Sequence, residues 1–190
     1  MRVNSLPVAF PLPDEVTDPA EIAEICRFRA QVWRDTGQTA ADAFPVQGWR
    51  DPIDRVCRHW VIRDPAGQLL AAGRLSVHAT LDDVHQAEEY RRYGLDLEGP
   101  IAAPDRVVVC PTLQGAGLGR RILDVQDEAA RQMGARHAVR QASPGMVRLI
   151  TQRGWRVVGP ASADARFPGV LFQVATKSFA SDAGELPCSH

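Results

Sequence analysis

The stretch that most constrains the fold is a glycine-rich segment at 107–121, which reads VVVCPTLQGAGLGRR. A valine-rich run is typical of a buried β-strand, and the segment after the glycines has the apolar periodicity of a helix. Gly115, Gly117 and Gly119 therefore fall in a turn that joins a strand to a helix. Glycine loses more conformational freedom on folding than any other residue, so this density indicates unusual backbone angles or a ligand close to the backbone.

Such a turn predicts an anion site. The first amides of a helix have no partner within the helix, and the helix dipole adds partial positive charge there. Arg120 and Arg121 add charge at the rim. The alternative is a plain turn, for which one glycine would suffice. The spacing is neither the GxxxxGK[ST] of a P-loop nor the GxGxxG of a dinucleotide-binding fold.

The remaining patterns predict a mixed α/β fold around a single sheet. Asp18-Pro19-Ala20-Glu21 is a capped helix start, and 35–57 is expected to be a loop with short helical pieces. After these we expect a hairpin at 59–78, a polar helix and loop in 81–100, a strand at 106–110, a helix ending near 134, a strand at 137–140, a helix at 146–153 and strands near 155–158 and 170–175. A length of 190 residues suits one domain, predicted at 18–178, between an N-terminal arm at 1–17 and a flexible tail at 179–190.

The composition of the chain argues against several classes of binding partner. A formal net charge of -1 argues against a nucleic-acid binder. The cysteines form no CxxC pair and no histidine stands at zinc-ligand spacing, so we expect no metal and reduced thiols in the cytoplasm. The chain has no apolar run long enough for a signal peptide or a spanning helix, so no membrane association is expected. A homodimer stays open.

The segment QGAGLG at 114–119 resembles the Q/R-x-x-G-x-G/A signature of the GCN5-related N-acetyltransferase (GNAT) family. The resemblance includes the preceding valines, Pro111 and the motif GWRVVG at 154–159, and it covers the element order from about 20 to 176. It implies a GNAT-like acyl-CoA N-acyltransferase fold, with acetyl-CoA or another acyl-CoA as cosubstrate. The residues it assigns to pantetheine and pyrophosphate are Val107, Val108, Val109, Gln114, Gly115, Ala116, Gly117, Leu118, Gly119 and Arg120, and Ser143 replaces an asparagine that often contacts the pantetheine arm.

Acyl transfer to an amine needs a neutral amine, a polarised carbonyl and a protonated leaving thiolate. Many family members protonate the thiolate with a tyrosine, but the corresponding residue here is Ile150. We expect Asp105, on the same strand face as Val107 and Val109, to be the base, and His78 to be the second candidate. The alternative for Asp105 is a solvated side chain or an ion pair with Arg106, and the alternative for His78 is a surface histidine. His59 and His85 are lesser candidates for the base.

A second resemblance lies in the first half of the chain. The segment FRAQVW at 28–33, Asp51, Asp54 and the GRL segment at 73–75 are similar to the N-terminal half of acyl-homoserine-lactone synthases. This implies a substrate site with Arg29, Trp33 and Arg74. An arginine on an apolar helix stripe needs an acidic partner, so the alternative is an Arg–Asp clasp that fixes the 35–57 loop.

The function predicted is therefore a cytoplasmic N-acyltransferase that transfers an acetyl group to a primary amine of a small metabolite or an amino-acid-like acceptor. A protein amine stays open as acceptor. The alternatives are an acyltransferase that uses a carrier protein, as acyl-homoserine-lactone synthases do, and a non-catalytic acyl-CoA sensor.

Overall fold

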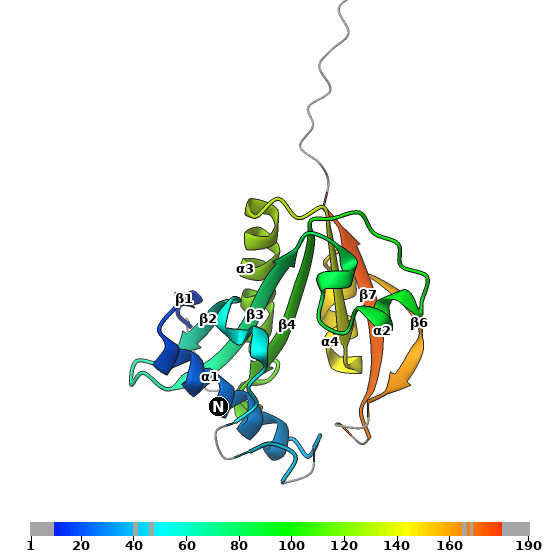
Figure 1. The fold of residues 1–190 in the computed structure, drawn as a ribbon. Coiled ribbons are helices and arrows are strands. Elements are labelled where there is room, and N and C mark those ends of the chain that lie inside the picture. Colours follow the sequence, from blue (N-terminus) through cyan, green and yellow to red (C-terminus); the bar gives the residue numbers. More distant parts are fainter. Residues whose placement is uncertain (1–9, 40–41, 46–47, 165–166, 168, 180–190) are drawn as a thin grey trace, which may run out of the picture.

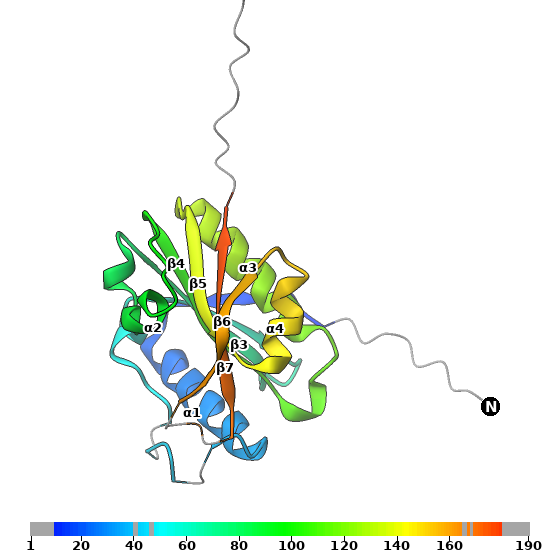
Figure 2. The ribbon, with the colours of Figure 1, turned by 90° about the vertical axis from the view of Figure 1, so that its right-hand side faces the viewer.

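The computed structural model describes residues 10–39, 42–45, 48–164, 167 and 169–179. The described elements are β1 (Asp14–Val16), α1 (Pro19–Asp35), η1 (Pro52–Arg55), β2 (Arg58–Arg63), β3 (Leu69–His78), η2 (Leu81–Asp83), α2 (Ala87–Arg91), β4 (Ile101–Val109), η3 (Pro111–Leu113), α3 (Leu118–Gln132), β5 (His137–Ala142), α4 (Pro144–Thr151), β6 (Arg156–Ala163) and β7 (Leu171–Ser178). Seven strands form one mixed sheet in the order β1-β2-β3-β4-β5-β7-β6. The helices α1 and α2 cover one face, and α3 and α4 cover the other (Figures 1 and 2). The predicted mixed α/β class is confirmed.

Local sequence signals explain why α1 begins at Pro19. The Asp18 carboxylate accepts a hydrogen bond from the Ala20 amide at 2.7 Å, and Pro19 occupies the first turn, as the sequence predicted. Ile22, Ile25 and Cys26 then face the sheet.

Three elements differ in extent from the sequence-based expectation. Residues 14–16 of the expected arm form an edge strand, the helix expected in 81–100 is limited to the short η2 and α2, and β4 begins five residues before position 106.

The C-terminal boundary also differs from the sequence prediction. Phe179, expected to begin the tail, is buried in the core against α3, where Arg131 lies over its ring. Residues 180–190 lie outside the described part of the chain. No helix among the described residues is both long and apolar enough to cross a bilayer.

The strands β4 and β5 pair over a short distance only. Their parallel register joins Ile101 to His137 and Ala102 to Ala138, and no later pair is formed between them among the described residues. From residue 103 onward, one edge of β4 is therefore free of a neighbouring strand. The valine segment predicted to bind a pantetheine arm lies on this open edge.

A bulge in β4 changes which residues share a face. Ala72 pairs with Val108 and Arg74 with Asp105, so β4 has one more residue than β3 in this interval, and Arg106 has a φ of 53°. Val107 packs with the α3 cluster, whereas Val108 packs with the α1 cluster. The expectation that Asp105 shares a face with Val107 and Val109 was wrong, because the bulge reverses the alternation and directs Asp105 to Arg74 on the α1 side.

The helix α3 holds this bulge in place. The Gln126 side chain donates through Nε2 to the carbonyl of Arg74 at 2.6 Å and to that of Asp105 at 3.3 Å. Opposite it, Gly73 leaves room for the helix, because a Cβ at this position would lie 2.3 Å from Ile122 Cγ2. The close approach of α3 therefore fixes the two strands that bear the candidate site.

Candidate functional site

A groove of about 1050 Å³ runs along the open edge of β4. Of the residues assigned to an acyl-CoA, those lining it are Val107, Val108, Val109, Gln114, Gly115, Ala116, Gly117, Gly119, Arg120 and Ser143. The side chain of Leu118 is instead buried in the core, so only its backbone is available to a ligand. The residues assigned from the sequence therefore lie on one continuous surface.

The glycine loop has the geometry that its composition predicted. Gly115 and Gly117 have φ angles of 88° and 91°, which favour glycine. Gly117 caps α3 without a side-chain hydrogen bond, so the first amides of the helix have no partner among the described residues. Gly119 is different, because a Cβ there would only touch Val109 and Leu149 at ordinary distances of 3.5 and 3.8 Å. The protein's own packing does not require a glycine at 119, whereas a ligand close to the helix end would.

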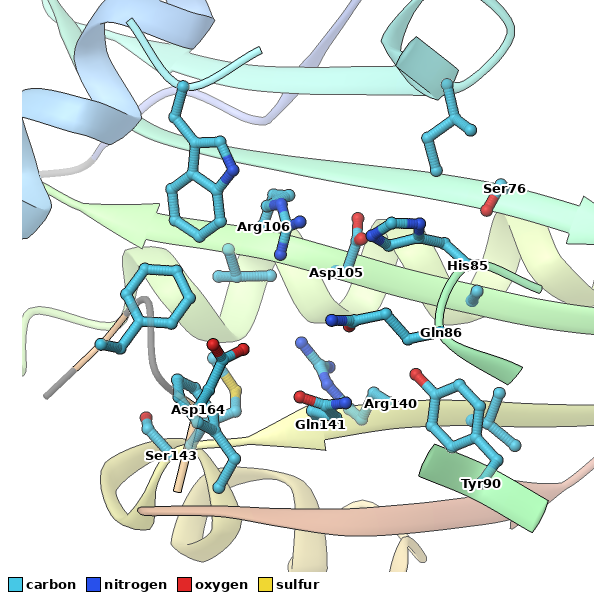
Figure 3. A pocket seen from close by; sticks show the side chains of 18 of the residues that line it. Ser76, His85, Gln86, Tyr90, Asp105, Arg106, Arg140, Gln141, Ser143 and Asp164 are labelled. Carbon is cyan, nitrogen blue, oxygen red and sulfur yellow. The ribbon is translucent and has the colours of Figure 1, made fainter. Parts of the chain in front are cut away.

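A second, smaller cavity of about 100 Å³ adjoins the groove, with Trp33, Val107, Ser143 and Met146 lining both. One part of its wall is aromatic and consists of Trp33, Trp49, Phe167 and Phe172. The other part is polar and includes His85, Gln86, Tyr90, Asp105, Arg106, Arg140 and Gln141 (Figure 3). We call this space the inner cavity.

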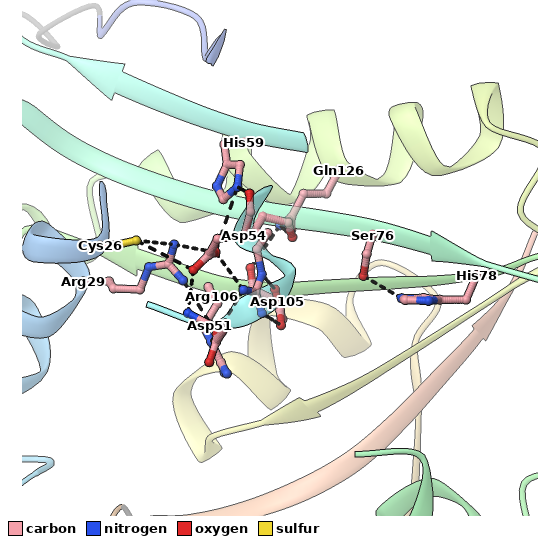
Figure 4. A network of polar contacts seen from close by, with 11 residues as sticks. Cys26, Arg29, Asp51, Asp54, His59, Ser76, His78, Asp105, Arg106 and Gln126 are labelled. Carbon is pink, nitrogen blue, oxygen red and sulfur yellow. Dashed lines mark hydrogen bonds and ion pairs between the residues drawn. The ribbon is translucent and has the colours of Figure 1, made fainter. Parts of the chain in front are cut away.

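Six charged side chains form a cluster beside the inner cavity, four of them buried and two, Asp105 and Arg106, half-buried. We call this cluster the charge network (Figure 4). Its members are Arg29, Asp51, Asp54, Arg74, Asp105 and Arg106. Arg74 donates to Asp54 at 2.7 Å, to Asp51 at 2.9 Å and with two nitrogens to Asp105 at 2.7 and 2.5 Å. Arg29 donates to Asp54 at 3.0 Å. The network ties α1 and η1 to β3 and β4.

The arginines keep the three carboxylates of the network ionised. Burial alone would raise the pKa of Asp54, but the guanidinium groups of Arg29 and Arg74 outweigh it and lower that pKa. The same balance lowers the pKa of Asp105, where Arg74 is the main cation, and holds the pKa of Asp51 well below its usual range through Arg106 and Arg74. Three arginines thus neutralise three aspartates.

These contacts decide between the alternatives for the first-half residues. Arg29 and Arg74 line neither the groove nor the inner cavity. The expectation that they bind substrate is corrected in favour of the Arg–Asp clasp, because their donors face the network's aspartates. Trp33 does line both spaces, and its role in substrate binding stays a prediction.

The two expected catalytic residues are placed differently. Asp105 lines the inner cavity, but it accepts two hydrogen bonds from Arg74. His78 lines neither space, and its Nε2 lies 2.9 Å from the Ser76 hydroxyl. His85 is the histidine in the cavity wall, where burial lowers its pKa and keeps its imidazole neutral at pH 7.

Several residues of the polar wall were missed from the sequence. Gln86 has a φ of 64° and precedes α2, Tyr90 is within α2, and Arg140 and Gln141 lie on β5. One signal was available, because an arginine within the AVRQA strand pattern is the same anomaly that singled out Arg29. At Ile150, the position of the usual acid, the side chain is buried in the core.

Comparison with known proteins supports the fold. No protein-family model matches the sequence, and no curated protein sequence matches it. Among solved structures, BjaI, a CoA-dependent acyl-homoserine lactone synthase crystallised with SAM and isopentyl-CoA, is similar with a TM-score of 0.66 at 12% identity, covering 90% of this chain and 84% of that one. FeeM, an N-acyl amino acid synthase from uncultured soil microbes, has a TM-score of 0.63 at 11% identity, covering 88% of this chain and 90% of that one.

A GCN5-related N-acetyltransferase from Kribbella flavida is also similar, with a TM-score of 0.56 at 16% identity, covering 88% of this chain and 98% of that one. The neighbours thus include both kinds of enzyme that the sequence resembles. The GNAT fold, with its link to acyl-homoserine-lactone synthases, is confirmed.

Proposed function

We propose that this chain, which has the fold of the GNAT N-acyltransferases, transfers an acyl group from an acyl-CoA to a primary amine of a small acceptor. The observation that carries the proposal is the groove along the open edge of β4, which ends at the uncapped first turn of α3. It offers unpaired strand backbone to a pantetheine arm and helix amides to a pyrophosphate. We further propose acetyl-CoA as the donor, in a cytoplasmic protein.

The reacting carbonyl is expected near the bulge of β4. Arg106 and Val107 have no paired residue on β3, and β5 has already diverged at this level. Backbone amides without a sheet partner are the groups that could polarise a thioester carbonyl. The acceptor amine would enter from the inner cavity, because Val107 lines both spaces.

In the proposed reaction the amine nitrogen attacks the thioester carbon, and the carbon–sulfur bond breaks as the amide bond forms. The neutral imidazole of His85 is placed to accept the amine proton, since it lies in the cavity wall. Asp105, the base expected from the sequence, would have to release Arg74 first. With Ile150 in the core, the thiolate is released without the usual tyrosine.

Gly119→Ala tests the groove in isolation. Alanine is the better helix former by about 1 kcal/mol, and its Cβ makes only ordinary contacts, so the free energy of unfolding should stay the same or rise. The same Cβ should hinder a diphosphate, and we expect the KM for acetyl-CoA to rise about tenfold in an assay of thiol release with mixed amines. An unchanged KM would remove the diphosphate from this loop.

In the same assay, His85→Gln should lower kcat, with His78→Gln as a control of the same residue type outside both spaces. A parallel reaction with acyl-carrier protein separates the carrier-dependent alternative. CoA binding by calorimetry without thiol release from any donor would indicate the acyl-CoA sensor.

A further inference from the structure

Arg140 is a buried cation in the wedge where β4 and β5 diverge. Its side chain is 3% exposed and lines the inner cavity, and Figure 3 shows the guanidinium between the two strands. Its guanidinium lies 5.5 Å from the centre of the Trp155 ring. Burial lowers its pKa to about 10, which still leaves it positively charged at pH 7.

No carboxylate among the described residues neutralises this charge. The Arg140 side chain makes no hydrogen bond or ion pair with the described residues, and its Nε and Nη1 atoms are buried without a partner. The carboxylates whose charge raises its pKa are those of Asp105 and Asp127. Asp105 is already paired with Arg74, and Asp127 accepts a hydrogen bond from Lys177 at 2.6 Å. Since an isolated buried charge is costly, this arrangement calls for an anion from outside the chain.

Donor side chains beside Arg140 suit a small anion, and the carboxylates of Asp105 and Asp164 line the same cavity. Tyr90 and Gln141 line the cavity beside it and can donate hydrogen bonds, as can Gln86, which is held in the left-handed region. A guanidinium offers paired N–H groups that match the two oxygens of a carboxylate. The cavity of about 100 Å³ adjoins the groove at Trp33 and Val107, so an acceptor with an apolar side chain can contact the aromatic wall and extend into the groove.

Building on the proposed function, we infer that Arg140 binds the carboxylate of an amino-acid acceptor, so that the protein makes N-acyl amino acids. The carboxylate would lie on Arg140 in the wedge, the amine would face Val107 and His85, and the apolar side chain would contact the aromatic wall. A carboxylate at the far end of the acyl donor has the same chemistry, so the experiment must separate the two sources.

The test compares matched acceptors with acetyl-CoA as donor, by thiol release. L-Phenylalanine is compared with L-phenylalaninamide, in which a neutral amide replaces the carboxylate, with each rate corrected for the fraction of neutral amine. We expect a kcat/KM at least about tenfold higher for the amino acid, because a charged hydrogen-bonded pair would be lost with the amide. Arg140→Met should abolish this preference by lowering the value for the amino acid alone, and Arg140→Lys should keep part of it. Arg156→Met, at an exposed arginine on β6, is the matched control.

A second arm places the carboxylate on the donor. Succinyl-CoA and butyryl-CoA are compared with phenylalaninamide as acceptor, and we expect no preference that depends on Arg140. A preference for succinyl-CoA that Arg140→Met removes would overturn the amino-acid assignment. A preference for the amino acid that survives in Arg140→Met would overturn the role of Arg140, as would the absence of any carboxylate preference.

A binding measurement separates this inference from the proposed function. N-acetyl-L-phenylalanine and its amide are titrated by calorimetry, with no turnover required. Tighter binding of the acid by about tenfold, lost in Arg140→Met, would support the carboxylate site even if no thiol were released. Equal binding of acid and amide, with thiol release intact, would contradict the inference and leave the acyltransferase proposal standing.

Discussion

The charge network and Arg140 are two ways of burying arginine in the same small domain. In the network, Arg29, Arg74 and Arg106 each have an aspartate oxygen within 3.0 Å. Arg140, on the far side of the wedge between β4 and β5, has an aromatic ring and no described carboxylate. Arg29, Arg74 and Arg140 are all almost inaccessible to solvent, so burial alone does not distinguish them.

The difference shows that the partners of a buried arginine indicate whether it stabilises the fold or binds a ligand. A buried guanidinium surrounded by its own aspartates stabilises the contacts between the elements that carry them. A guanidinium that faces a cavity and has no hydrogen-bonded aspartate contributes little to the fold and is available to a ligand. The two arginines singled out from the sequence as substrate residues belong to the first kind, and the arginine that was overlooked belongs to the second.

The largest effect is expected from Asp54→Asn. Asp54 accepts hydrogen bonds from Arg29, Arg74 and the Asp51 amide, and its side chain is fully buried. Removing its charge leaves an unbalanced cation in the network, which should lower the free energy of unfolding by about 3–5 kcal/mol. Urea denaturation followed by circular dichroism measures this change.

Glu15→Gln is the matched control for that variant, because the Glu15–Arg58 pair is about one-third exposed on both sides. A loss of about 1 kcal/mol or less is expected there. If Asp54→Asn were no more costly than this control, the network would not be what holds η1 against α1 and β3.

Local sequence, together with the resemblance to the GNAT family that it carries, was enough to predict the groove but not the inner cavity. The strand, the GxGxG turn and the helix are continuous in the chain, so Val107 to Arg120 could be assigned together. The polar wall instead combines residues before and within α2 with residues of β5, and their meeting depends on how far β4 and β5 diverge. No pattern within either segment specifies that divergence.

The bulge in β4 is a second feature that the sequence did not predict. Strict alternation placed Asp105 with Val107 and Val109, but the positive φ of Arg106 adds a residue to the strand and turns Asp105 toward Arg74. A positive φ at an arginine has no local signature, since it is imposed here by Gln126 on α3 and by the ion pairs of Arg106 and Asp105. The clasp of Arg29, in contrast, followed from a charge on an apolar stripe.

Lowering the pH is expected to have an intermediate effect on the free energy of unfolding. The pKa values of Asp51, Asp54 and Asp105 are lowered in the folded protein, so their ionised forms favour folding above the unfolded pKa of about 4, and this stability is lost as the pH falls. The free energy of unfolding should therefore drop by about 2 kcal/mol or more between neutral pH and about pH 3. Asp54→Asn should show a smaller drop, whereas Arg140→Met should match the wild type. A shallower acid dependence in Arg140→Met would mean that Arg140 also stabilises the network's carboxylates.

The smallest effect is expected on the stability of Arg140→Met. Methionine has a similar reach and can keep contact with Trp155, while the loss of the cation over the ring costs about 0.5–1 kcal/mol. Against this stands the relief of a buried charge without a carboxylate partner, so the free energy of unfolding should be unchanged or higher by about 1 kcal/mol. The same urea denaturation at neutral pH measures it, and Arg140→Ala, which leaves a void beside Trp155, shows how much the aliphatic stem contributes by packing. A loss of about 2 kcal/mol or more in the free energy of unfolding of Arg140→Met would place Arg140 with the network's arginines as a structural cation. A buried arginine without an acidic partner should instead be replaceable by an uncharged residue with little change in that free energy.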